Sequence, residues 1–388
     1  MNIVFSDHPL PKNLTKSIFL AGPSPRELSV HDWRHEAIDY LKSINFQGSI
    51  FVPIPERRFK GEAESPNWNY HDQVNWECEA RSVADVILFW IPRSISGKMP
   101  GFVTNIEFGE DLSTGKVVYG RPVEAEKCKY LDKRFEDLGK PVHDTLEKTI
   151  SYAVKVLGDG AFRENGEIHI PLFIWNSNQF QSWYSNLKLA GNTLDSAKVI
   201  SQFTLPNGQL FSYQIKVKIW VKEEKRFKEN EIVFARTDVV QAVMYYKTSD
   251  DTKVVLIKEF RSPVNNPSGY VYELPGGSSF DLNKDPVDII IDEIKEECGL
   301  SITDKHRFIF TSQRQSMATL SSHISSVYKI ELTDVEYATL LSNKDKSFGN
   351  VGESEITYIE VVSLKDITDY HLDYSTIGMI YNALFVYE

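Results

Sequence analysis

Apolar and polar positions follow two periods over the first 120 residues. The short apolar runs are 17–21, 49–52, 85–90 and 116–120, and the segments with helical spacing are 31–41, 73–83 and 104–114. Short apolar runs between helical segments predict strands that are buried on both faces. This order of strands and helices predicts an α/β domain with a parallel sheet and helices on both faces. Ligands of such sheets bind at the carboxyl ends of the strands.

The pattern changes after residue 198. The longer strand patterns are 211–221, 232–246 and 253–259. One strong helix follows Asp285, and further strands complete an α+β domain. Gly158-Asp159-Gly160 and Asn165-Gly166 interrupt both periods and indicate a boundary. The expected parts are an α/β domain at 1–160, a connector rich in aromatic residues and Asn at 161–198, and an α+β domain at 199–388.

Composition limits the classes of function. A chain of 388 residues fits two domains, and a net charge of −11 argues against non-specific binding to nucleic acid or anionic membranes. Its three cysteines lack CxxC spacing, which argues against a disulfide framework or a zinc knuckle. No apolar run approaches about 18 residues, and the start lacks a signal-peptide pattern. We expect a soluble, cytoplasmic protein that binds small molecules.

The helix after Asp285 carries the sharpest chemical signal. Asp285 is a good N-cap, Pro286 suits the first turn, and Gly299 suits the C-terminal stop. Glu293, Glu296 and Glu297 share one face of this helix, opposite an apolar stripe of Val287, Ile290, Ile291 and Ile294. Three like charges on one face repel, and a hard cation such as Mg²⁺ or Mn²⁺ would relieve that repulsion. The alternative is a solvated acidic face.

This segment resembles the Nudix box. Residues 293–300, EIKEECGL, match the E-U-x-E-E-x-G-U end of that box, in which U is a bulky aliphatic residue, and they follow the strand and turn Glu273-Leu274-Pro275-Gly276-Gly277. The resemblance implies a Nudix fold and a metal-dependent pyrophosphohydrolase. It implies that Glu293, Glu296 and Glu297 bind Mg²⁺ or Mn²⁺ with the backbone of Gly277, and that the metal activates water for attack on phosphorus.

Two positions depart from the box. Asp292 stands where the family has Arg, Lys284 stands at the first Glu, and the loop after Gly277 is one residue longer. The flanking segments resemble the branch of the family that hydrolyses ADP-ribose and nucleoside-diphosphate sugars. On that resemblance Arg261 and Glu273 belong to the substrate site, with Arg261 holding a phosphate or pairing with a neighbouring acid. Glu353 and Glu355 correspond to the acidic loop that supplies a general base, and their alternative is a solvated loop.

A second set of candidates lies in the first domain. Gly22 and Pro23 end the first apolar run, Asp85 opens the third, and Glu107 lies in the helix that follows a loop. A carboxylate beside the ligand edge of a sheet can attack or stabilise an oxocarbenium-like anomeric carbon. The alternatives are a helix-cap role for Glu107 and a structural role for Asp85.

Residues 15–125 resemble the nucleoside 2-deoxyribosyltransferase-like superfamily. The resemblance rests on the segments FLAGP (19–23), ADVILFW (84–90) and IEFGE (106–110) in that order, followed by GKVV (115–118). It implies that Glu107 is the nucleophile and that Asp85 holds the base or the reacting groups. The other implied pocket residues are Gly22, Pro23, Trp33, Arg34, Gln73, Trp76 and Glu77. Phe19 replaces the family's tyrosine, and Pro100-Gly101 replaces an acidic residue, so deoxyribosyl transfer, hydrolysis of an N-glycosidic bond and simple nucleotide binding remain alternatives.

Together the two resemblances imply a bifunctional nucleotide-processing enzyme. The C-terminal domain would hydrolyse an ADP-ribose-like diphosphate, and the N-terminal domain would cleave or transfer a base–sugar bond. The alternative is a nucleotide sensor with degenerate sites, favoured by Asp292 and Phe19. Nucleic-acid decapping or repair is disfavoured by the acidic charge. Both resemblances imply that the protein forms a homo-oligomer. They also imply that its substrates are small nucleosides or nucleotides.

Overall fold

The computed structural model describes residues 1–63, 65–205, 208–281, 283–350, 352 and 354–386. It divides the chain into two compact units, Met1–Phe234 and Ala235–Glu388. The division differs from the expected boundaries after residues 160 and 198. The expected connector and the first strands of the expected second domain belong to the first unit.

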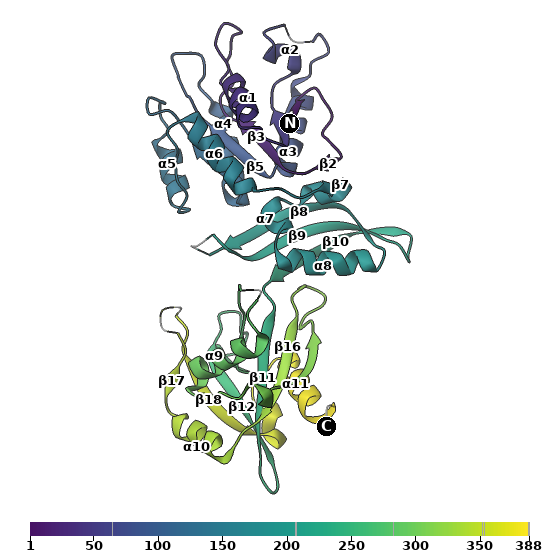
Figure 1. Cartoon of the computed structure of the whole chain (residues 1–388), viewed down its shortest axis with the longest axis vertical. Coiled ribbons are helices and arrows are strands. Elements are labelled where there is room, and N and C mark those ends of the chain that lie inside the picture. The colour runs from purple at the N-terminus through teal and green to yellow at the C-terminus, as the bar shows by residue number, and fades with distance from the viewer. Residues whose placement is uncertain (64, 206–207, 282, 351, 353, 387–388) are drawn as a thin grey trace. The chain divides into compact units, whose positions relative to one another are not determined.

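The first unit is built on a five-stranded parallel sheet with the order β1-β4-β3-β5-β6 (Figure 1). Its strands are β1 (Asn2–Phe5), β4 (Ser49–Val52), β3 (Ser17–Ala21), β5 (Val86–Trp90) and β6 (Val117–Gly120). The predicted parallel sheet is confirmed, and β1 is a strand that the sequence pattern did not reveal. All residues of β3 to β6 are buried, which explains their continuous apolar runs.

Helices cover both faces of this sheet. Alternate residues of β3, Ile18 and Leu20, pack with α1 (Arg34–Ser43) and α6 (Leu146–Leu157). The residues between them, Phe19 and Ala21, face the other side. That side holds α3 (Tyr70–Val83), α4 (Phe102–Asp111) and α5 (Lys129–Glu136), and the short α2 (Glu56–Phe59) precedes α3. The layers match the predicted α/β class.

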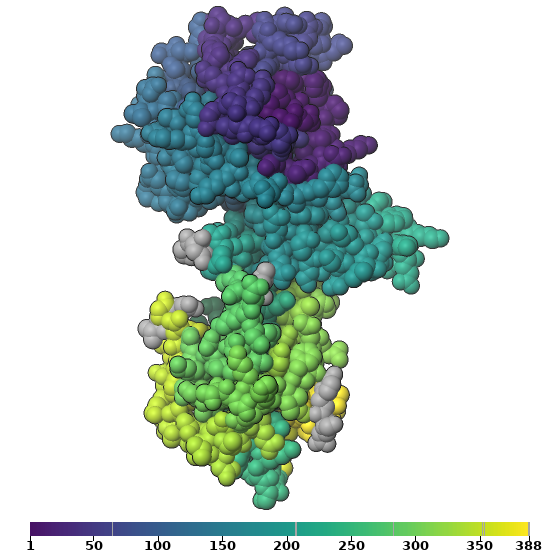
Figure 2. Space-filling view, in the orientation of Figure 1, coloured from purple at the N-terminus to yellow at the C-terminus, as the bar shows by residue number. Residues whose placement is uncertain are grey.

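A second, three-stranded sheet completes the first unit, in the order β10-β9-β8. Its strands are β8 (Thr193–Thr204), β9 (Leu210–Val221) and β10 (Arg226–Arg236). The helices α7 (Leu172–Trp175) and α8 (Asn178–Leu189) precede it, and buried Phe180 and Tyr184 of α8 form an aromatic cluster with Trp175. In Figure 2 these teal residues join the blue and purple part of the same unit as one surface. The expected connector is therefore folded structure.

A short strand pair ties the two sheets of the first unit together. β2 (Asn13–Leu14) pairs with β7 (Arg163–Glu164), and the 3-10 helix at Asn165–His169 follows β7. Gly166 of this helix lies so close to β8 that a Cβ atom there would sit 2.3 Å from the Leu194 carbonyl oxygen. The loop that was predicted as a domain boundary is thus a tightly packed junction.

The second unit is a mixed sheet with helices on both faces. Its strand order is β15-β16-β11-β12-β18-β17, with β13 added to β12 and β14 added to β11. The strands are β11 (Val239–Lys247), β12 (Thr252–Phe260), β13 (Tyr270–Glu273), β14 (Gly276–Gly277), β15 (Ile309–Arg314), β16 (Ser325–Glu331), β17 (Ser347–Phe348) and β18 (Thr357–Ser363). β11 and β16 are parallel, and the other strand pairs described for this sheet are antiparallel.

The helices of the second unit lie on opposite faces of its sheet. α9 (Pro286–Cys298) and α10 (Asp334–Asn343) contribute to one core, through residues such as Ile290 and Leu340, while α11 (Tyr374–Tyr381) contributes Ile380 to the other. The predicted ends of α9 are confirmed, because Asp285 caps Val287 and Gly299 is left-handed at φ 62°. Ile289 is buried in the apolar stripe, whereas Val287 and Ile291 are only partly buried. Within the described residues, no helix is both long and apolar enough to span a bilayer.

The strand predicted at 232–246 is two strands of different sheets. β10 ends at Arg236 and β11 begins at Val239. Between them, Asp238 accepts a hydrogen bond from the backbone of Ile324 at 2.9 Å, which starts the pairing of β11 with β16. Apolar residues continue through both strands, so periodicity alone does not reveal the break.

Candidate functional site

A cavity of about 470 Å³ lies at the carboxyl edge of the parallel sheet. Its floor includes Phe19, Ala21 and Gly22 from the end of β3, and its walls come from α3 and α4. Gly22 is required there, because a Cβ atom would lie 2.1 Å from the carbonyl oxygen of Trp90. The cavity therefore occupies the place where the sequence pattern predicted ligand binding.

Two carboxylates, Glu77 of α3 and Glu107 of α4, meet in this cavity. Burial, followed by repulsion from Glu77, raises the pKa of Glu107 to about 7. Burial also raises the pKa of Glu77, while a hydrogen bond from Gln73 opposes that rise. Because two ionised carboxylates in one cavity repel each other, such a pair is suited to sharing a single proton near neutral pH.

Two arginines surround the carboxylates, and both line the cavity. Arg34 is fully buried and donates to the carbonyl oxygens of Leu20 at 3.0 Å and Gly22 at 2.8 Å. It thereby fixes the end of β3, and Asp32 balances its charge. Arg81 bonds to Asp111 at 2.8 Å, which links α3 to α4. The predicted binding residue Arg34 thus lies in the site.

The mouth of the cavity is apolar and open to solvent. It is formed by exposed side chains of the first turns of α3 and α4, namely Tyr70, Val74, Phe102, Val103 and Ile106. These residues were not predicted, because exposed apolar side chains at helix starts resemble ordinary surface positions in a sequence. An apolar rim over charged residues suits a ligand with an aromatic ring and a polar sugar.

Four residues predicted for this site, Pro23, Trp33, Trp76 and Asp85, do not line the cavity. The ring of Pro23 packs beside Gly101 and its carbonyl oxygen accepts from Trp33. Trp76 packs against Phe19 and Phe51 and donates to the His8 carbonyl oxygen at 2.8 Å. Pro23 and Trp76 shape the wall from behind.

Asp85 is buried at the amino end of β5, the opposite edge of the sheet from the cavity. Its two carboxylate oxygens accept from the two terminal nitrogens of Arg163, each at 2.7 Å, and Ser17 and the backbone of Leu172 complete its hydrogen bonds. This corrects the expectation that Asp85 belongs to the site. A strand's first residue lies away from the ligand edge, and a buried, bidentate ion pair of this kind holds segments together.

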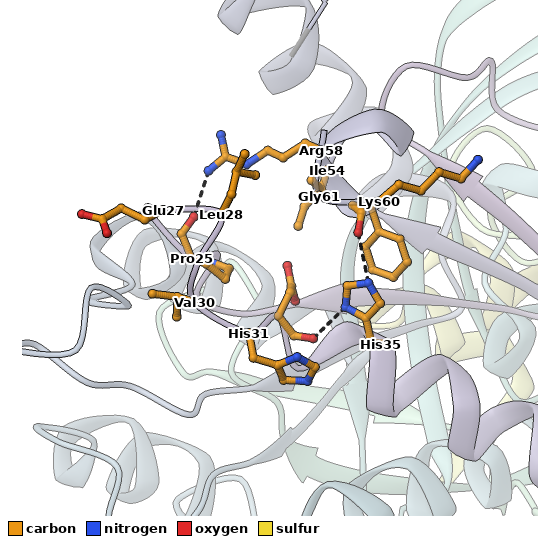
Figure 3. Close-up of a pocket in the computed structure, with 12 residues that line it drawn as sticks. Pro25, Glu27, Leu28, Val30, His31, His35, Ile54, Arg58, Lys60 and Gly61 are labelled. Atoms are coloured by element: carbon orange, nitrogen blue, oxygen red, sulfur yellow. Dashed lines mark hydrogen bonds between the residues drawn. The ribbon is translucent and has the colours of Figure 1, made fainter. Parts of the chain in front are cut away.

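A smaller cavity of about 230 Å³ shares the loop after β3 (Figure 3). Pro25, Glu27 and Leu28 line it, whereas Ser24 and Arg26 line the larger cavity. Arg58 donates to the Pro25 carbonyl oxygen at 2.8 Å. The ring nitrogens of His35 face the carbonyl oxygens of Asp32 and Phe59, each at 3.0 Å. These contacts hold the loop that carries one wall of the larger cavity.

In the second unit, the predicted acidic residues gather around the Gly276–Gly277 turn. Buried Glu297 accepts from the Gly276 backbone nitrogen at 3.0 Å, and a Cβ atom on Gly277 would lie 1.9 Å from Glu293 Oε1. Burial and then repulsion from Glu296 raise the pKa of Glu293 to about 7. Burial and then repulsion from Glu293 raise the pKa of Glu297 well above its usual range. Glu355 adds to the repulsion on both, and Glu353 lies outside the described residues.

The donor set has the chemistry that a hard cation requires, because carboxylates surround a turn that only glycine fits. Within the described residues, however, no three acidic, His or Cys side chains already converge as a ligand set. The positions that depart from the box contact each other, since Lys284 pairs with Asp292 at 2.7 Å. Arg261 pairs with Glu273 at 3.0 Å and with Glu259 at 2.8 Å.

Comparison with known families agrees with the first unit. Residues 15–123 match the family model described as nucleoside 2-deoxyribosyltransferase like, a range that contains β3 to β6 together with Glu77 and Glu107. This match supports an N-terminal domain that is similar to this family. The matched range ends well before the second unit. No curated protein matches the chain.

Proposed function

We propose that the first unit is an enzyme that cleaves or transfers the N-glycosidic bond of a small nucleoside or nucleotide. The observation that carries the proposal is the pair Glu77 and Glu107, which face one cavity at the ligand edge of the matched domain. The apolar mouth suits the nucleobase, and the carboxylates and arginines beneath it suit the sugar.

The pair supplies both the nucleophile and the proton donor that the reaction needs. In the proposed mechanism, ionised Glu107 attacks the anomeric carbon, and the electrons of the C–N bond leave with the base. Protonated Glu77 donates its proton to the departing base nitrogen, so the base leaves neutral. The resulting ester between Glu107 and the sugar is then opened by water or by a second base, and the proton released returns to Glu77. Water gives hydrolysis, and a second base gives transfer.

We further propose that the second unit is a Nudix-type hydrolase of an ADP-ribose-like diphosphate. The resemblance of residues 273–300 to the box supports it, together with the gathering of Glu293 and Glu297 at the glycine turn. Glu293, Glu296 and Glu297 would hold Mg²⁺ or Mn²⁺ with the backbone of Gly277. The cation would neutralise phosphate charge and lower the pKa of a bound water.

Other residues of the second unit have roles in this proposal. Arg261 would exchange its pairing with Glu273 for a substrate phosphate. Glu355, with Glu353, would accept the proton of the attacking water. Burial raises the pKa of Glu259, which pairs with Arg261, to about 7. Glu259 therefore joins Glu293 and Glu297 as a third carboxyl group of raised pKa in the second unit.

One experiment tests both proposals on the full chain. The protein is incubated with Mg²⁺ or Mn²⁺ and a panel of ADP-ribose, nucleoside-diphosphate sugars, nucleosides and nucleoside monophosphates, beside Glu107→Ala and Glu297→Gln variants. Chromatography with mass spectrometry identifies the products. Free base lost only in Glu107→Ala supports the first proposal, and a monophosphate lost only in Glu297→Gln supports the second. Ligands that raise the melting temperature without any cleavage would favour a nucleotide sensor instead.

A further inference from the structure

A chain of hydrogen bonds reaches Glu77 from outside the cavity. The indole nitrogen of Trp68 donates to Gln73 Oε1 at 2.8 Å. Gln73 Nε2 donates to Glu77 Oε1 at 2.8 Å and to the carbonyl oxygen of Pro53 at 3.2 Å. Trp68 itself does not line the cavity, whereas Gln73 and Glu77 do.

The amide of Gln73 has only one orientation that satisfies all three partners. Its two N–H groups meet two acceptors, Glu77 and Pro53, and its oxygen meets the only donor, Trp68. A reversed amide would set its oxygen against two oxygens and its N–H groups against the indole N–H. Because an amide that accepts at its oxygen is a stronger donor at its nitrogen, the Trp68 bond strengthens the bond to Glu77.

This bond also decides which oxygen of Glu77 carries a proton. Oε1 accepts from Gln73, so in the acid form of Glu77 the proton resides on Oε2. Oε2 is therefore the oxygen left to serve a ligand in the cavity. A carboxylic acid held in this way donates in one direction without first rotating.

We propose that Trp68 is a positioning residue which, through Gln73, aims the proton-bearing oxygen of Glu77 at the leaving nucleobase. The proposal rests on the N-glycosidic function proposed for the first unit. It assigns to the segment before α3 a part in proton transfer, although Trp68 touches no substrate.

Other groups near Glu77 have different effects and define the controls. Glu107 of α4 repels its charge, while Arg34 of α1 and Arg81 of α3 attract it. The hydrogen bonds described for Arg34 and Arg81 go to residues other than Trp68. Tyr70 packs edge-on against Trp68 at 6.3 Å between ring centres and lines the cavity mouth, so the substitution at Trp68 must retain an aromatic ring.

The test is a double-mutant cycle of Trp68→Phe and Gln73→Leu in the full chain, with Trp183→Phe of α8 as a matched control. We expect Trp68→Phe to lower kcat for base release roughly threefold to tenfold, the equivalent of one neutral hydrogen bond, with little change in KM. In the Gln73→Leu background Trp68→Phe should have no further effect. Trp183→Phe should leave kcat and KM unchanged.

A second substrate distinguishes an effect on proton transfer from other effects of the substitution. The positively charged base of an N7-methylated purine nucleoside departs without receiving a proton, so Trp68→Phe should leave its rate unchanged. Additive effects in the cycle, a loss confined to KM, or equal losses with both substrates would overturn the role of Trp68 while leaving the proposed function in place. If the wild-type protein releases no base from either substrate, the proposed function fails and the role of Trp68 fails with it.

Discussion

The acidity of two residues, Glu77 and Glu107, links the structure of the first unit to the reaction proposed for it. The proposed mechanism requires one proton on the pair, and that last proton leaves with a pKa of about 7, set by burial and by the repulsion between the groups. We therefore expect base release to slow as the pH rises through about 7. In Glu77→Gln the repulsion is absent, so Glu107 ionises at lower pH and this alkaline decline should disappear, with a lower maximal rate. A pH–kcat profile of both proteins measures this, and an unchanged decline in Glu77→Gln would contradict it.

The raised pKa of Glu107 also predicts how the stability of the folded protein varies with pH. The last proton of the Glu77–Glu107 pair leaves the folded protein with a pKa of about 7, whereas the Glu107 carboxyl of the unfolded chain loses its proton with the ordinary pKa of 4.5. Stability from this group is complete below about 4.5 and is lost as the pH rises through about 7. Glu107→Gln removes the charge, so its melting temperature should exceed that of the wild type at pH 8, and the two should converge near pH 5. Thermal unfolding at both values checks this, and the opposite order at pH 8 would show that Glu107 is stabilised as an anion.

Sequence patterns predict a residue's element better than its partners. Glu107 and Arg34 were predicted for the site and line its cavity. Asp85 was predicted with them, yet it pairs with Arg163, which lies 78 positions further along the chain. A contact between such distant positions leaves no local pattern. The position of Asp85 at the start of the apolar run 85–90 was the available signal, because the ligand edge is at the other end of the strand.

At the scale of elements, Gly277 sets how closely β14 approaches α9. A methyl group there would meet Glu293 Oε1 at 1.9 Å and its carboxyl carbon at 2.4 Å, so Glu293 must move. We expect Gly277→Ala to lower the proposed diphosphate hydrolysis about a hundredfold, the usual effect of misplacing a reacting group by an ångström. Base release by the first unit should not change, and assaying both reactions on one preparation provides the control. Full diphosphate hydrolysis in the variant would exclude Glu293 from the site.

The contact between Lys284 and Asp292 ties the loop after β14 to α9. The resemblance to the box left these two departures unexplained, but the structure pairs them at 2.7 Å, so each compensates the charge of the other. Lys284 is 35% exposed and Asp292 is 66% exposed, so solvent screens the pair and its expected contribution is about 0.2–1 kcal/mol. Lys284→Glu and Asp292→Lys should each destabilise the protein by up to about that amount, and the double variant should recover most of it.

Denaturant unfolding at low and high salt measures the coupling between these two positions. The losses in the single variants should shrink in high salt, because screening weakens exposed pairs. Equal losses at both salt concentrations, with no recovery in the double variant, would show that the two side chains act independently of each other.

The elements themselves were largely predictable where the apolar period was strong. β3 to β6 and α9 lie where the patterns indicated, because complete burial or a clear cap fixes their ends. β10 and β11 were predicted as one strand, because their apolar residues run on without a proline or glycine between them. The break at Thr237-Asp238 depends on pairing with β16, almost ninety residues later, and tertiary pairing overrides local pattern there.

At the scale of the whole molecule, the chain is two units, and their boundary is where the sequence was least informative. The change to long strand patterns predicts that the second domain starts at residue 199. In the structure those strands belong to the first unit, because β8 contacts the 3-10 helix at Asn165–His169 and β9 contacts α7. The composition and the strand pattern both change within the first unit, Met1–Phe234, so neither change coincides with the boundary between the units.

This boundary predicts the behaviour of shortened chains. A chain of residues 1–236 keeps β8, β9 and β10 complete, so it should unfold cooperatively and release base at the rate of the full protein. A chain of residues 1–198 cuts β8 after Lys198 and lacks β9, so α7 loses its contact with β9 and buried Leu194 loses its partner Ile219. Burying a large apolar side chain contributes about 1.5–3 kcal/mol, so losing several such contacts exceeds the margin of a typical domain. The shorter chain should therefore aggregate or melt without a sharp transition. Calorimetry and gel filtration distinguish the two outcomes, and a stable, active 1–198 chain would restore the boundary that the sequence pattern suggested.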